Sequence, residues 1–192
     1  MEERQLLYKN SRVHYYRFGN GPAPVFCFHG YGEAASSFLF LEKYAGDEFS
    51  FYSVDLPFHG KTDWQEGLDF TQQDLLQIIE AIFHENSANT GSQNAIFSLM
   101  GFSLGGRMAL SLYQAMPNKI DKLVLLAPDG LKVNFWYWLS TQSFLGNKLF
   151  AFTMQHPHWF FGFLKILNAL KLVNASIFKF VNHYIGDTTV RR

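Results

Sequence analysis

Two hydrophobic patterns alternate along residues 1–130. Short continuous apolar runs, bounded by Gly, Pro or Asp, are typical of strands buried on both faces, and they occur at 24–28, 50–55, 95–100 and 122–127. Stretches at 34–44, 71–83 and 103–116 instead show apolar residues at helical spacing. Strands that alternate with helices predict a mainly parallel sheet covered on both faces, which is an α/β fold.

Local signals refine two of these elements. Thr71 followed by Asp74 is typical of a capping box, so we expect a helix to begin there. Residues 4–18 alternate loosely and stop at the Gly-Asn-Gly-Pro cluster of 19–22, a turn signal between extended segments. The beginning of the chain is therefore predicted to form a hairpin.

The pattern changes after Gly130. The remaining residues show no bounded strand-like run and carry Phe, Trp and Leu at helical spacing instead. Polar residues and the Gln-His-Pro-His segment at 155–158 interrupt the uncharged stretches, so no transmembrane helix is expected. The sequence predicts two parts: an α/β core over 1–130 and a helical, aromatic-rich segment over 131–192.

Composition narrows the class of protein. With 192 residues, 48% hydrophobic and 17% charged, the chain has the profile of a globular protein. Sixteen Lys and Arg balance sixteen Asp and Glu, so no overall basic field favours nucleic acid or anionic lipid. The single cysteine, Cys27, and the acidic start without a signal-peptide pattern lead us to expect a cytoplasmic protein.

A candidate nucleophile lies where the third buried strand gives way to a helix. The sequence there is Gly101-Phe102-Ser103-Leu104-Gly105-Gly106, in which small residues on both sides of Ser103 allow a tight strand-to-helix turn. Such a turn projects the serine hydroxyl. A glycine-rich turn without chemistry is the alternative interpretation.

A serine that attacks a carbonyl also needs two donors for the oxyanion. The Leu104 N–H, at the start of the helix, is one candidate. The segment His29-Gly30-Tyr31-Gly32 follows the first buried strand and can supply the Tyr31 N–H as the second. In the alternative interpretation, this segment simply ends a strand.

Three motifs in this order resemble the α/β-hydrolase superfamily: His-Gly-x-Gly at 29–32, Asp-Leu-Pro-Phe-His-Gly-Lys-Thr at 55–62, and Gly-Phe-Ser-Leu-Gly-Gly at 101–106. The second resembles the capped branch of esterases, carbon-carbon bond hydrolases, epoxide hydrolases and cofactor-free haloperoxidases. The resemblance implies that 4–130 form the first six strands of the core sheet and that 131 onward is a helical cap. It implies no cofactor.

The chain departs from the family pattern at the other two members of the triad. The family places an acid and then a histidine after the seventh and eighth strands, whereas this chain ends inside what resembles the cap. Asp129, after the sixth predicted strand, is a candidate acid, with a turn residue as the alternative. No histidine of the chain matches the base, so the expected site is incomplete and the chain resembles an N-terminal fragment.

Other candidate sites carry less chemistry. His156 and His158 have no nearby carboxylate or thiol to complete a metal site, and Cys27 is interpreted as a small core residue. The aromatic cap segment is interpreted as packing that also lines an apolar pocket.

The sequence therefore predicts a serine hydrolase acting on an ester or related carbonyl substrate with an apolar part, through an acyl-enzyme on Ser103. A non-catalytic binding module on a shortened fold is one alternative. A peripheral membrane protein is another, although the basic face that such helices normally carry is thin because the cap has few lysines. Strand 122–127 is predicted to be an exposed edge that permits self-association.

Overall fold

The computed structural model describes residues 1–87, 96–128 and 143–169. The chain divides into two compact units, Met1–Leu131 and Lys132–Arg192. Asp129 and His183 lie outside the described residues.

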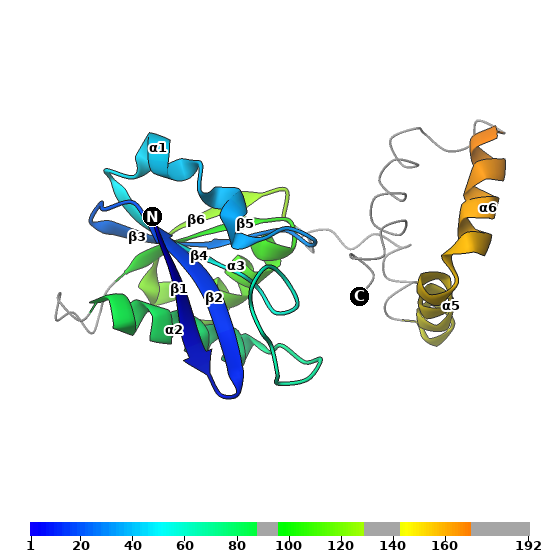
Figure 1. Cartoon of the computed structure of the whole chain (residues 1–192), viewed down its shortest axis with the longest axis horizontal. Coiled ribbons are helices and arrows are strands. Elements are labelled where there is room, and N and C mark those ends of the chain that lie inside the picture. The colour runs from blue at the N-terminus through cyan, green and yellow to red at the C-terminus, as the bar shows by residue number, and fades with distance from the viewer. Residues whose placement is uncertain (88–95, 129–142, 170–192) are drawn as a thin grey trace. The chain divides into compact units, whose positions relative to one another are not determined.

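The first unit is built on a six-stranded, mostly parallel sheet (Figure 1). Its strand order is β1-β2-β4-β3-β5-β6, in which β1 and β2 form an antiparallel hairpin and β2 also pairs antiparallel with β4. The parallel part of the sheet comprises β4, β3, β5 and β6. The bounds of the strands are β1 Glu2–Tyr8, β2 Ser11–Phe18, β3 Ala23–Phe28, β4 Phe49–Val54, β5 Phe97–Phe102 and β6 Ile120–Leu126.

Helices cover the two faces of this sheet unequally (Figure 1). On one face, α2 (Gln72–Ser87) and α3 (Leu104–Ala115) bury the larger core, which includes Phe26, Ile79 and Leu112. On the other face, the short elements η1 (Ala35–Phe38) and α1 (Leu41–Ala45) cover a smaller cluster. A second short 3₁₀ helix, η2 (Pro117–Lys119), leads into β6.

The α/β fold class predicted from the sequence is confirmed, and the apolar runs correspond to β3, β4, β5 and β6 within two residues at each end, although no residue of β6 is fully buried. The capping box is also present: the Thr71 N–H and hydroxyl donate to Asp74 Oδ2 at 3.0 and 2.6 Å. The Asp74 N–H in turn donates to Thr71 Oγ1 at 3.1 Å. These bonds fix the start of α2.

The N-terminal hairpin forms, but its turn is not at the predicted breaker cluster. The hairpin turns at Lys9 and Asn10, where Lys9 adopts a φ of 53°. Residues 19–22 instead connect β2 to β3, two strands that are separated in the sheet by β4. Turn residues mark where the chain changes direction, whereas the pairing partner is decided by contacts distant in sequence.

Strand β6 is the edge of the described sheet beside β5. On the α3 face, Leu123 and Leu125 pack against the large core. On the opposite face, Val124 and Leu126 remain 38% and 45% exposed. This edge therefore presents apolar side chains and one row of backbone hydrogen-bonding groups.

The described part of the second unit consists of α5 (Phe144–Gln155) and α6 (Pro157–Ala169). The Ser143 hydroxyl caps α5 by accepting from the Gly146 N–H at 3.0 Å, and His156 separates the two helices. None of the helices in the described ranges combines the length and the hydropathy needed to cross a membrane.

Candidate active site

Ser103 occupies a strained turn between β5 and α3. Its backbone adopts φ 50° and ψ −113°, outside the regions that non-glycine residues normally occupy. The Ser103 N–H donates to the carbonyl of Leu126 at 3.0 Å, and the Ser103 carbonyl accepts from the Gly106 N–H at 3.0 Å. The turn is thus held by β6 on one side and by the first turn of α3 on the other. This is the geometry expected of a nucleophile elbow.

The glycines around Ser103 make this turn possible. A Cβ placed on Gly105 would lie 1.9 Å from the carbonyl oxygen of Phe28, and one on Gly101 would lie 2.3 Å from the carbonyl oxygen of Gly105. Both contacts are with backbone atoms, which cannot move aside as a side chain can. Glycine at these two positions therefore lets α3 begin directly against the end of β3.

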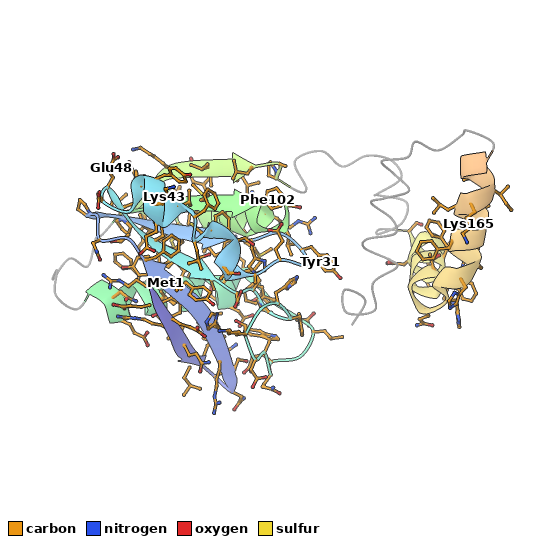
Figure 2. The ribbon with its side chains drawn as sticks, turned by 45° about the horizontal axis from the view of Figure 1, so that its top comes forward. Met1, Tyr31, Lys43, Glu48, Phe102 and Lys165 are labelled. Atoms are coloured by element: carbon orange, nitrogen blue, oxygen red, sulfur yellow. The ribbon has the colours of Figure 1, made fainter. Side chains whose placement is uncertain are left out.

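The predicted oxyanion donors, the N–H groups of Tyr31 and Leu104, lie on turns that follow the neighbouring strands β3 and β5. The register of the sheet places Phe28 of β3 beside Gly101 of β5, so the turns that carry Tyr31 and Leu104 both start at the carboxyl edge of the parallel strands. Leu104 is the first residue of α3, whose N-terminal N–H groups favour negative charge. Tyr31 is 46% exposed, and Figure 2 shows it and Phe102 at the same end of the first unit.

His29 is a buried structural residue rather than a base. Its Nε2 accepts from the Leu56 N–H at 3.0 Å, which places the ring proton on Nδ1, 2.8 Å from the Gly30 carbonyl oxygen that accepts it. Burial lowers the pKa of His29, so the ring is neutral. The imidazole thereby joins the end of β3 to the loop that follows β4.

Asp55, at the start of that loop, is 1% exposed and forms the centre of a buried network. Its carboxylate accepts from the Ala35 N–H at 2.6 Å and from the Lys61 N–H at 2.9 Å. It also bonds His14 Nδ1 at 2.7 Å, and His14 Nε2 lies 3.1 Å from Glu3 Oε1. The network fixes η1, the 55–62 loop and β2 relative to one another.

The sequence places His14 within the predicted N-terminal hairpin of residues 4–18 and does not predict this network. The apolar residues around His14 indicate only that it belongs to a buried strand, since β2 lies inside the sheet between β1 and β4; they do not indicate Asp55 as its partner. His59 is likewise engaged, since its Nδ1 lies 2.8 Å from the carbonyl oxygen of Pro57 and its ring packs against Tyr31.

Among the described residues, none forms a hydrogen bond with the Ser103 hydroxyl. The exposed His84 lies on α2, and the exposed His156 and His158 lie in the second unit. The candidate acid Asp129 falls outside the described residues. No group of His, Cys, Asp and Glu in the described ranges has the arrangement of a metal site, and Cys27 is fully buried, which raises the pKa of its thiol.

A cleft of about 320 Å³ opens between η1, α1 and the ends of β5 and β6. Phe102 and Leu126 contribute to its wall. Phe102 precedes Ser103 in the chain, and the Leu126 carbonyl accepts the hydrogen bond from the Ser103 N–H. Its walls are mainly apolar, with Glu33 and Ser37 as the polar exceptions. Ser103, Tyr31 and Leu104 are not among the residues that line this cleft, which lies beside the elbow on the η1 face of the sheet.

Comparison with protein-family models decides the family. The model described as "alpha/beta hydrolase fold" matches residues 23–181, which is most of the chain. The chain belongs to the α/β-hydrolase family. The resemblance carried by the three motifs is thus confirmed at the level of the family.

Curated relatives of this α/β hydrolase include an uncharacterized hydrolase, YugF, of Bacillus subtilis, 27% identical over 66% of the chain and 45% of the relative. A pimeloyl-[acyl-carrier protein] methyl ester esterase of Nitrosomonas europaea is 28% identical over 66% of the chain and 46% of the relative. The chain spans about half the length of these relatives.

A solved structure with the same fold is a putative lipase of Acinetobacter baumannii, with a TM-score of 0.60 and 19% identity. The match covers 73% of the chain and 46% of that structure. This likeness shows the α/β-hydrolase fold.

Proposed function

We propose that this α/β hydrolase carries the nucleophile and the oxyanion-binding turns of a serine hydrolase that acts on an ester or related carbonyl substrate with an apolar part. The observation that carries the proposal is the backbone of Ser103, held at φ 50° between β5 and α3. A non-glycine residue in this conformation costs about 1–3 kcal/mol, and such strain gathers at active sites.

In the proposed reaction, Ser103 Oγ attacks the substrate carbonyl and forms an ester bond while the alcohol or related group leaves. The N–H groups of Tyr31 and Leu104 hold the oxyanion during attack. The apolar part of the substrate is proposed to use the mainly apolar walls beside Phe102 and Leu126. The esterase of Nitrosomonas europaea among the relatives supports an ester as the substrate class.

The rate of the proposed reaction depends on a base that activates the Ser103 hydroxyl. In the described first unit, the rings of His14, His29 and His59 are engaged elsewhere. Losing the base of a triad commonly costs several powers of ten in rate. We therefore expect turnover of an activated ester by this chain to lie within about tenfold of its Ser103→Ala variant, since oxyanion stabilisation alone still gives some catalysis.

A fluorophosphonate tests the nucleophile, because it needs a positioned serine and an oxyanion hole but little help from a base. We expect slow labelling of Ser103, identified by peptide mass spectrometry and abolished in Ser103→Ala. Ser36→Ala, which removes an exposed serine of η1, is the matched control and should label as the parent does. An adduct on another serine would remove Ser103 from the proposal.

A non-catalytic binding module is the second candidate, because the mainly apolar cleft beside Phe102 and Leu126 could hold an apolar ligand without any reaction at Ser103. It predicts binding of an apolar ligand with no fluorophosphonate adduct on Ser103. The same labelling experiment therefore separates the two functions.

A further inference from the structure

The overall charge of zero conceals a strong separation of charge between the two units. Residues 1–131 contain nine Lys or Arg and fifteen Asp or Glu, whereas residues 132–192 contain seven Lys or Arg and one acidic residue, Asp187. No Asp or Glu occurs anywhere between 132 and 186. The second unit is thus a basic body, although the composition of the whole chain predicts no basic field.

The described helices of this basic unit expose an unusual amount of apolar side chain. On α6, Trp159, Phe163 and Ile166 recur at positions i, i+4 and i+7, which places them on one face, and they are 43%, 49% and 60% exposed. The buried Leu164 lies on another face of the helix. The exposed stripe is therefore separate from the side of α6 that packs.

Helix α5 extends this stripe. The rings of Phe152 and Trp159 lie 6.0 Å apart, so the exposed apolar residues of α5 are continuous with those of α6. We call this surface the α5–α6 aromatic surface. Its described members are Phe144, Leu145, Leu149, Phe152, Trp159, Phe163 and Ile166.

Cations accompany the aromatic surface. The exposed Lys148 lies 4.4 Å from the centre of the Phe144 ring, and the exposed Lys165, labelled on α6 in Figure 2, is adjacent in sequence to Ile166. These two lysines are the charged residues of the described α5 and α6. Trp, Phe and Leu beside lysines, without a carboxylate, is the composition of a helix that lies in a lipid interface.

We infer that the α5–α6 aromatic surface docks on an anionic lipid bilayer, with its rings in the headgroup region and the lysines on the lipid phosphates. The complementary charge favours this occupant over a second copy of the chain, because two such surfaces brought together would also bring their lysines together. In this arrangement the helices lie on the bilayer surface. The inference does not depend on the reactivity of Ser103.

Co-sedimentation with lipid vesicles tests the inference on the full chain. We expect binding to vesicles of phosphatidylcholine mixed with phosphatidylserine, much weaker binding to phosphatidylcholine alone, and loss of binding as salt is raised. The double variant Lys148→Gln, Lys165→Gln should weaken binding by about fivefold per lysine. The double variant Phe163→Ser, Ile166→Ser should weaken it at least tenfold, since it removes two exposed apolar side chains from the interface.

Leu68→Ser is the matched control, because Leu68 is a 91% exposed apolar residue of the first unit and its replacement should leave vesicle binding unchanged. Equal binding to the two kinds of vesicle, or equal loss in Leu68→Ser, would overturn the inference. The inference would also be overturned if the parent chain did not bind vesicles and was an oligomer that became a monomer in the Phe163→Ser, Ile166→Ser variant. The surface would then be occupied by a second copy of the chain.

Discussion

Replacing Gly105 by alanine tests how the elbow is built. The added Cβ would lie 1.9 Å from the Phe28 carbonyl oxygen, 2.4 Å from its carbon and 2.8 Å from the His29 carbonyl oxygen. Ordinary van der Waals contact begins near 3.4 Å, so the start of α3 must retreat from β3 by about 1.5 Å. All three obstacles are backbone atoms, at the end of β3 and in the residue that follows it. We expect a loss of about 3 kcal/mol in the free energy of unfolding, at the upper end of the usual cost of overpacking.

The same shift predicts a loss of reactivity, because Leu104 precedes Gly105 and carries one of the two proposed oxyanion donors. A displacement of 1 Å can cost about a hundredfold in rate, so fluorophosphonate labelling of Ser103 should slow by about that factor under conditions where the variant remains folded.

Urea unfolding followed by circular dichroism gives the stability, and peptide mass spectrometry gives the labelling rate. Gly162→Ala is the matched control: a Cβ there meets no atom within 4 Å, and alanine in a helix should stabilise α6 by up to about 1 kcal/mol. A Gly105→Ala variant with the parent's stability and labelling rate would refute the tight contact between α3 and β3.

Three further predictions concern the first unit. Because burial lowers the pKa of His29, the unfolded state binds the proton more readily than the folded state does. The free energy of unfolding should therefore fall as the pH drops below about 6.5. His29→Gln should flatten this pH dependence, as measured by urea titrations at several pH values. An unchanged slope would contradict the neutral ring. Burial tends to raise the pKa of Asp74, but hydrogen bonds from Lys9, Thr71 and Tyr8 lower it overall, so its stabilisation is present above about pH 4 and lost below. Asp74→Ala should cost about 1–2 kcal/mol at pH 7, and the difference from the parent should shrink as the solution is acidified; a pH-independent difference would assign the effect to packing. Finally, the apolar edge at β6 predicts self-association at micromolar concentration and binding of an apolar dye, both reduced in Leu126→Lys, as measured by sedimentation velocity; a dye-free monomer would show that this edge is covered.

The local parts of the fold could be predicted because they depend on neighbouring residues. The apolar run that forms β3 is buried on both faces, and the bonds between Thr71 and Asp74 act over three residues. The elbow could also be placed, because only a few small residues permit the backbone that Ser103 adopts.

Contacts between distant segments could not be predicted in the same way. The insertion of β4 between β2 and β3 depends on side chains that meet only in the folded sheet. The bond between His14 and Asp55 joins residues 41 positions apart, and neither residue carries a local signal for the other. The exposed apolar stripe on α6 could not be predicted either, because the sequence does not show which face of the helix packs against other residues.

The central claim is that Ser103 is an acyl-accepting nucleophile. Its most direct test is to mix the chain with an activated aryl ester, quench in acid and measure the intact mass, followed by peptide mapping. The proposal predicts a single acyl group on the peptide that contains Ser103, and its absence in Ser103→Ala. An acyl group on a lysine or another serine, or one that persists in Ser103→Ala, would contradict it.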